Sequence, residues 1–182
     1  MRTRLVIALL VATGLAGTAY ACAGGPVKRP DGGEGLLPVG SPAPDLSGKD
    51  ERGAVVGLRD YRGSAVVVYF YPKDETPGCT KEACAFRDNY QAFETKGVHI
   101  LGVSQDTEEI HRQFRTKFKL PFALVADADG AITRAYGVKS TLGMSSRVTF
   151  LVDGQGRIAK IWPDVDPVVH ATEVLAAASA LK

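Results

Sequence analysis

An unbroken apolar run followed by a helical pattern is the feature that most constrains the fold of this 182-residue chain. Residues Ala65 to Pro72 read AVVVYFYP, a run of β-branched and aromatic side chains that ends in proline. Such a run is typical of a strand buried on both faces of a sheet with parallel neighbours. From Cys79 the pattern changes to a helical period. Its apolar positions are Ala83, Phe86, Tyr90 and Phe93, and Gly97 is the expected stop.

Strands and helices alternate along the rest of the chain. A hairpin with Val55 and Val56 in its second arm precedes the apolar run. The elements predicted after it are a strand at Val98–Ser104, a Thr-capped helix at Thr107–Leu120 with Ile110, Phe114 and Phe118 on one side, a short strand in FALVAD, a short helix or turn in DGAITRAYGV, two strands joined by Asp-Gly-Gln-Gly within Val148–Trp162, and an Ala-rich helix over Asp166–Lys182. This order predicts an α/β fold with thioredoxin-like layering, in which helices flank a central mixed β-sheet on both faces.

The first 21 residues predict an export signal. Arg2 and Arg4 precede the apolar stretch LVIALLVATGLAG, and Ala19-x-Ala21 matches a cleavage site. The alternative is an uncleaved anchor, but the strongly apolar part falls short of the ~20 residues that a spanning helix needs. We therefore expect a protein of the periplasm or cell envelope. A flexible Gly/Pro-rich tether at 22–36 and one domain at 37–182 would follow.

Cys22 follows the predicted cleavage point directly. A cysteine there is similar to the acylated cysteine of bacterial lipoprotein signals, which would anchor the protein to a membrane. Such signals usually have Leu three residues before the cysteine and a small residue two before it, where this chain has Ala19 and Tyr20. Lipidation of Cys22 and plain secretion therefore both stay open.

The charge balance argues against nucleic-acid binding. The net charge is +2, and removal of the leader with its two arginines leaves 20 basic and 20 acidic residues. The chain has no basic tract that would follow a phosphate backbone.

Cys79 lies where a helix is expected to begin. Pro77 and Gly78 form the turn into that helix, at the C-terminal end of a central strand, where α/β proteins bind ligands. The unpaired N–H groups and the dipole of a helix N-terminus stabilise a thiolate. Thr76 offers a hydroxyl beside the sulfur. A reactive cysteine is therefore expected, although a structural disulfide from Cys79 to Cys84 would also suit an oxidising compartment.

The motif Pro72-x-x-x-Thr76-x-x-Cys79 resembles the signature of the peroxiredoxins, thiol peroxidases on a thioredoxin-type fold. The longer string FYPKDETPGCTKEACAFRD is similar to that of their bacterioferritin-comigratory, or Q-type, subgroup. The resemblance continues through LRDYRG, LGVSQD, KLPF, DADG, AYGV and RVTFLVDGQGRI, and it covers roughly Val39 to the C-terminus. It departs at Val148, where Ser is common, and at Ala123, where a second Pro is usual.

The resemblance implies roles for particular residues. Cys79 matches the cysteine that attacks the peroxide O–O bond and becomes a sulfenic acid. Thr76 matches the hydroxyl that binds peroxide oxygen, and Pro72 matches the residue that shields the sulfenate. Arg147 matches the arginine that holds the thiolate and polarises peroxide, a role that suits a permanently charged guanidinium. Arg87 could help from the same helix or simply lie on the surface.

Cys84 matches the resolving cysteine of the Q-type subgroup, which closes an intramolecular disulfide with Cys79. Five residues on a regular helix separate Cα atoms by ~8.5 Å, whereas a disulfide needs roughly 4.4–6.8 Å. The helix must therefore unwind locally for this bond to form, which counts against a permanent disulfide. An intramolecular partner also removes the need for a dimer, so we expect a monomer.

The expected activity is reduction of hydrogen peroxide and organic hydroperoxides without a cofactor, at the expense of a thioredoxin-like dithiol reductant. Two other functions fit the same fold. A disulfide oxidoreductase would normally carry C-x-x-C, which this chain lacks. A copper chaperone would use two cysteines and a distant histidine such as His170. Otherwise His99, His111 and His170 read as exposed polar residues without a role.

Overall fold

A computed structural model describes residues 25–181 of the chain. The predicted signal at 1–21 and Cys22 lie outside the described residues. The strands are β1 (Gly48–Asp50), β2 (Val55–Val56), β3 (Ala65–Phe70), β4 (Val98–Ser104), β5 (Ala123–Ala126), β6 (Ser140–Thr141), β7 (Met144–Ser145), β8 (Val148–Val152) and β9 (Ile158–Trp162). The helices are α1 (Pro77–Asp88), α2 (Tyr90–Thr95), α3 (Glu108–Phe118), α4 (Ala131–Ala135) and α5 (His170–Ser179), with a 3₁₀ turn η1 at Leu58–Tyr61.

Seven strands form one mixed sheet in the order β2-β1-β5-β4-β3-β8-β9. β3, β4 and β5 are parallel, as expected of strands joined by crossover helices. β8 is antiparallel to β3 and β9 antiparallel to β8, so β3 has one parallel and one antiparallel neighbour rather than two parallel ones. The predicted fold class is confirmed.

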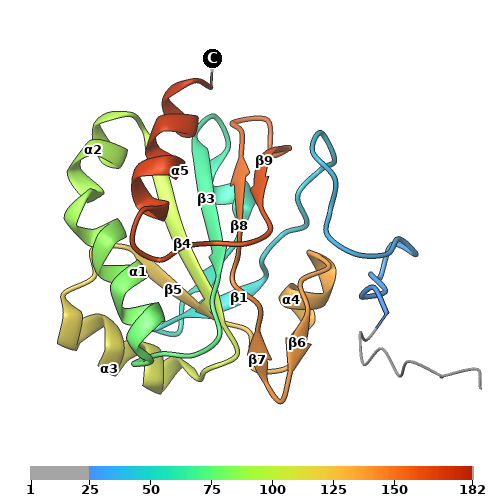
Figure 1. The fold of residues 1–182 in the computed structure, drawn as a ribbon, viewed down its shortest axis with the longest axis horizontal. Helices are drawn as coiled ribbons and strands as arrows, with labels where there is room; N and C mark the ends of the chain where they lie inside the picture. Colours follow the sequence, from blue (N-terminus) through green and yellow to red (C-terminus); the bar gives the residue numbers. More distant parts are fainter. Residues whose placement is uncertain (1–24, 182) are drawn as a thin grey trace, which may run out of the picture.

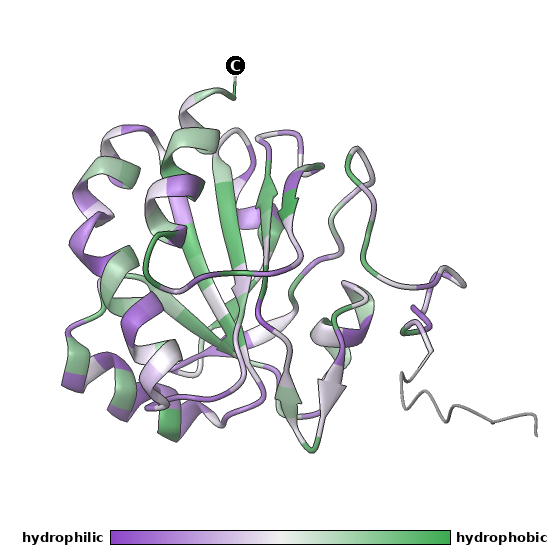
Figure 2. Cartoon of the chain, viewed as in Figure 1, coloured by the Kyte–Doolittle hydropathy of each residue, from purple (hydrophilic) through white to green (hydrophobic). Residues whose placement is uncertain are grey.

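Side chains of β3 alternate between two hydrophobic cores, one on each face of the sheet. Val67, Tyr69 and Tyr71 belong to a core that also takes residues from α1, α2, α3 and α5. Val66, Val68 and Phe70 belong to the other core, which includes α4 residues. Figure 1 shows α1, α2 and α5 on one side of the sheet and α4 on the other. Figure 2 shows the hydrophobic strands between these layers, which explains the continuous apolar run of β3.

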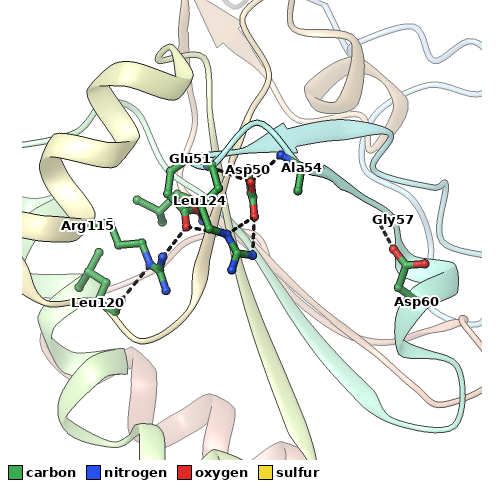
Figure 3. Close-up of polar contacts among 9 residues, drawn as sticks. Asp50, Glu51, Ala54, Gly57, Asp60, Arg115, Leu120 and Leu124 are labelled. Atoms are coloured by element: carbon green, nitrogen blue, oxygen red, sulfur yellow. Dashed lines mark hydrogen bonds and ion pairs between the residues drawn. The ribbon is translucent and has the colours of Figure 1, made fainter.

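The polar turn between β1 and β2 is fixed to the rest of the domain by buried carboxylates (Figure 3). Asp50 accepts a 2.9 Å hydrogen bond from the backbone N–H of Ala54, which closes the predicted hairpin. Glu51 pairs with Arg115 of α3 and accepts a 3.2 Å bond from the N–H of Leu124 in β5. The N-terminal hairpin is therefore an integral edge of the sheet.

Three details of the secondary structure differ from the sequence-based expectation. The helix predicted from Cys79 to Gly97 is two helices, because Asn89 leaves helical geometry and its side chain bonds the carbonyl of Ala85 at 2.8 Å. The hairpin of β6 and β7 was not predicted. In α3, Thr107 caps the N-terminus as expected, but the core-facing residue beside Phe114 is His111. Ile110 is 37% exposed.

Part of the predicted tether is packed on the domain. The side chain of Arg29 bonds the carbonyls of Glu34 and Gly35 at 3.1 and 2.7 Å, which closes a compact turn. The N–H of Leu37 donates to Tyr136 O at 3.2 Å. Residues 28–36 thus have a folded conformation instead of the uniformly flexible one expected from their composition.

Candidate active site

Cys79 is the third residue of α1, and its side chain is almost fully buried. Thr76 is the N-cap, Pro77 begins the helix, and the first helical bond runs from Thr80 N to Thr76 O at 2.9 Å. The N–H groups of the first helical turn have no acceptor within the helix, so the electrostatic potential at this end is positive. The sulfur of Cys79 therefore lies at the positive end of α1.

The sheet brings Arg147 to this cysteine from 68 residues away. Phe70, the last residue of β3, is paired with Val148, the first residue of β8. Arg147 directly precedes β8 and so lies beside the loop that leads into α1. Its Nη2 donates a hydrogen bond to Cys79 Sγ at 3.3 Å. Gly78 leaves room for this contact, because a Cβ at position 78 would lie 3.1 Å from Nη2.

Glu82, which was not predicted from the sequence, is a second buried group of the site beside Cys79. It follows Cys79 by three residues on the same face of α1, and its Oε2 accepts a short bond from Nη1 of Arg147. Burial raises the pKa of Glu82 to about 7, although the charge of Arg147 acts in the opposite direction. Burial alone would lower the pKa of Arg147, but Glu82 and Cys79 outweigh it and raise that pKa. One guanidinium therefore joins the thiol to a buried carboxyl.

Two further predicted residues lie in the loop between β3 and α1. Pro72 is half-buried and lies two residues beyond the end of β3. The hydroxyl of Thr76 donates to Lys73 O at 3.0 Å and makes no hydrogen bond to the helix that it precedes. Its oxygen therefore keeps lone pairs that could accept a hydrogen bond from a substrate. Arg147 thus contacts Cys79, and Pro72 and Thr76 lie in the loop that leads into the helix of Cys79. The roles of these four residues stay predictions.

Cys84 is a free, half-buried thiol in the same continuous helix as Cys79. This is the helical state in which the predicted disulfide cannot form. Arg87 lies near Cys84. The pKa of the Arg87 guanidinium is raised, chiefly by its bond to Asp88, with a smaller contribution from Cys84. Arg87 also donates to Phe118 O at 2.9 Å, which fixes the end of α1 to α3.

The prediction that the histidines are exposed holds only for His99. His111 and His170 are fully buried. His170 Nε2 lies 2.8 Å from Thr149 Oγ1, and burial together with the charge of Arg147 lowers its pKa to about 4. Residues 25–181 contain no group of three His, Cys, Asp or Glu side chains that could hold a metal ion. Cys79, Cys84 and His170, the residues expected to bind copper in a chaperone, therefore do not form such a group.

Sequence reasoning missed Glu82, His111 and His170 because charge and polarity were taken as signs of exposure. For Glu82 a signal was present. An acidic residue three positions after the cysteine shares a helix face with Phe86, which points into the core. A carboxyl on a buried face requires a cationic partner, and Arg147 was already a candidate.

Comparison with known proteins assigns the family. The AhpC/TSA family profile matches residues 39–161, and the chain is 41% identical over 146 residues to the putative peroxiredoxin bcp of Coxiella burnetii. That match covers 76% of this chain and 97% of the Coxiella protein. The chain is a peroxiredoxin of the AhpC/TSA family.

Two further relatives place this peroxiredoxin with the Bcp and Q proteins. Peroxiredoxin Bcp of Bacillus subtilis is 42% identical over 147 residues, which span 76% of this chain and 93% of the relative. The solved structure of the Xanthomonas campestris bacterioferritin comigratory protein, whose alkyl peroxide reduction activity has been studied, is 38% identical. It superposes with a TM-score of 0.68 over 72% of this chain and 88% of its own. The enzyme is thus a thiol peroxidase on the thioredoxin-like fold.

Proposed function

We propose that Cys79 is the nucleophile of this peroxiredoxin. Its thiolate attacks the terminal oxygen of ROOH, so that an S–O bond forms as the O–O bond breaks. The sulfur is oxidised by two electrons to a sulfenic acid, and the alkoxide leaves as ROH after taking a proton. The observation that carries this proposal is the 3.3 Å bond from Arg147 to the buried Sγ at a helix N-terminus. That guanidinium also stabilises charge on the departing oxygen.

In the second step, Cys84 attacks the sulfenic sulfur of Cys79. An S–S bond forms, the S–O bond breaks, and water leaves after protonation. A dithiol reductant then restores both thiols by disulfide exchange. The net reaction converts ROOH and a dithiol into ROH, water and a disulfide. The free thiols in one continuous α1 support the starting state of this cycle, and residues 79–84 must unwind before it can continue.

We further propose that the enzyme acts on hydrogen peroxide and organic hydroperoxides outside the cytoplasm, as a monomer. The substrate proposal is supported by the alkyl peroxide reduction activity of the Xanthomonas relative. The location is supported by the sequence pattern of residues 1–21. Among the described residues, no helix has the length and apolarity required to cross a membrane. The reductant at this location would be a thioredoxin-like protein, and Cys22 would be the point of any lipid anchor.

The Cys79→Ser variant tests the nucleophile. It should consume no peroxide beyond the uncatalysed rate, in a coupled assay with a dithiol, while its fold is unchanged by circular dichroism. Turnover like that of the wild type would refute the proposal.

The Cys84→Ser variant tests resolution. It should consume one equivalent of peroxide per Cys79 and then stop turning over with a dithiol reductant. Intact-mass analysis should show the wild type losing two hydrogens after peroxide treatment. The variant should instead gain one oxygen. The same spectrum of the native protein reports leader cleavage and any acyl group on Cys22. A steady-state rate equal to that of the wild type would exclude the resolving role.

A further inference from the structure

A buried polar cluster lies beneath the loop that leads from β3 to α1. Tyr71 Oη donates to Asp74 Oδ1 at 2.7 Å, and His111 Nδ1 lies 2.7 Å from Asp74 Oδ2. The N–H of Asp74 donates to Asp106 Oδ2 at 2.8 Å, and Ser104 Oγ bonds the same oxygen at 3.0 Å. All five residues are buried, and we refer to them as the Asp74 cluster.

Within this cluster, His111 is the hydrogen-bond donor from α3 to the loop between β3 and α1. Both oxygens of Asp74 accept bonds, so the facing nitrogen of His111 must carry the proton, and we assign the Nδ1–H tautomer on this geometry. Nε2 has no partner within residues 25–181. Among the described residues, the hydrogen-bond partners of this ring are both at Nδ1: Asp74 Oδ2 at 2.7 Å and, more distantly, Tyr71 Oη at 3.5 Å. The bond to Asp74 is the short one. That bond crosses from α3 to the loop.

The loop contains a backbone conformation that its surroundings must hold. Glu75 has φ of +61°, a left-handed conformation that a non-glycine residue adopts only when its surroundings hold it. Asp74 lies between Pro72 and Thr76. The family resemblance predicts that Thr76 binds the peroxide oxygen and that Pro72 shields the sulfenate. A displacement of Asp74 would therefore move the Thr76 hydroxyl relative to Cys79.

The Asp74 cluster matters most during the catalytic cycle. Unwinding of residues 79–84 removes the helical bond from Thr80 N to Thr76 O, which otherwise ties the loop to α1. The bonds of the Asp74 cluster reach instead to α3 and to the end of β4, which lie outside the unwound segment. The cluster can hold Pro72 and Thr76 in place while α1 opens and closes.

We propose that His111 and Asp74 are positioning residues of the peroxidase, which fix the loop that carries Thr76 through the side-chain bond from α3. This inference rests on the proposed function, together with the predicted role of Thr76 as the hydroxyl that binds the peroxide oxygen. In this proposal the buried His111 affects the reaction through Asp74 and does not contact the substrate.

The test compares His111→Leu with two matched variants. His111→Asn places an amide N–H near the position of Nδ1 and should restore the donor to Asp74. Thr133→Val removes a donor from another buried aspartate, because Thr133 Oγ1 bonds Asp127 at 2.6 Å in a cluster at α4. Each reduced variant is mixed with hydrogen peroxide in a stopped-flow instrument. The fluorescence of Trp162, in the same core as Cys79, reports the first oxidation.

The expected second-order rate constant for His111→Leu is about tenfold or more below that of the wild type, as for other small displacements of a reacting group. His111→Asn and Thr133→Val should stay within about threefold of the wild type. Alkylation of Cys79 by iodoacetamide, which does not use Thr76, should be unchanged in all three. A purely structural role would lower the rates of His111→Leu and Thr133→Val together.

A rate for His111→Leu equal to that of the wild type would overturn the inference. So would equal losses in His111→Leu and Thr133→Val, or a His111→Asn rate as low as that of His111→Leu. If His111→Leu does not fold, Tyr71→Phe removes the other donor to Asp74 and is judged by the same tenfold criterion. Cys79→Ser is measured in parallel. Peroxide consumption by that variant would refute the proposed function itself, whereas a fast His111→Leu beside an inactive Cys79→Ser refutes only the positioning role.

Discussion

The buried carboxyl of Glu82 predicts a pH dependence of folding stability that one substitution should remove. Burial raises the pKa of Glu82 to about 7 in the folded protein, from 4.5 for an exposed glutamate. A group with a raised folded-state pKa contributes stability that is fully present below its unfolded pKa. The contribution is lost as the pH rises through the folded pKa. The wild type should therefore lose stability between pH 4.5 and slightly above pH 7, relative to Glu82→Gln.

The size of the effect follows from the two pKa values. A pKa difference of one corresponds to about 1.4 kcal/mol, so the complete loss is about 3 kcal/mol. About 2 kcal/mol of that loss falls between pH 5.5 and 8.5, where both titration curves contribute. Glu82 lies between the two cysteines, so unwinding of α1 exposes it as global unfolding does. The same linkage should make the opening of α1 easier at higher pH.

Urea unfolding at half-unit steps from pH 5.5 to 8.5 measures this effect, with the thiols kept reduced and Trp162 fluorescence as the signal. The quantity of interest is the unfolding free energy of the wild type minus that of Glu82→Gln. Loss of the partner of Arg147 lowers the stability of the variant at every pH, but it does not change the slope of this difference. The difference should fall by about 2 kcal/mol across the range. A difference that stays constant, or rises with pH, would show that the carboxyl is not held in its neutral form by burial.

Two further predictions concern glycines that a side chain approaches closely. Gly78→Ala should slow the oxidation of Cys79 severalfold, because the new Cβ would lie 3.1 Å from Arg147 Nη2. The melting temperature of Gly78→Ala should equal or exceed that of the wild type, since alanine is favoured over glycine in helices by about 1 kcal/mol. A normal rate in stopped-flow measurements would contradict this. Gly102→Ala should cost about 1–3 kcal/mol in urea unfolding through overpacking, because its Cβ would lie 2.7 Å from the Tyr69 ring. Tyr69→Leu in the same chain should recover part of the loss, and a neutral Gly102→Ala would show that the ring moves freely.

Much of the fold could be predicted because local patterns reported it. The β3 run, the Thr107 cap and the Asp-Gly-Gln-Gly turn before β9 each depend on neighbouring residues alone, and the structure has each of them in place. The break at Asn89 was not predictable from periodicity, because the apolar spacing continues across it from Phe86 to Phe93. The β6–β7 hairpin has no β-branched run that would indicate strands.

The sequence by itself determined that a cysteine lies in the first turn of a helix after a central strand. It also determined that a second cysteine, five residues later, is too far away for a disulfide while that helix is intact, and which known family the motif resembles. Only the tertiary structure decided which side chains surround Cys79. Arg147 and Glu82 meet because β8 lies against β3, and His111 meets Asp74 because α3 packs under the loop. A helix or a turn is specified by residues a few positions apart. Contacts between residues 37 to 68 positions apart depend on strand pairing and on packing of the whole core, which no local pattern encodes.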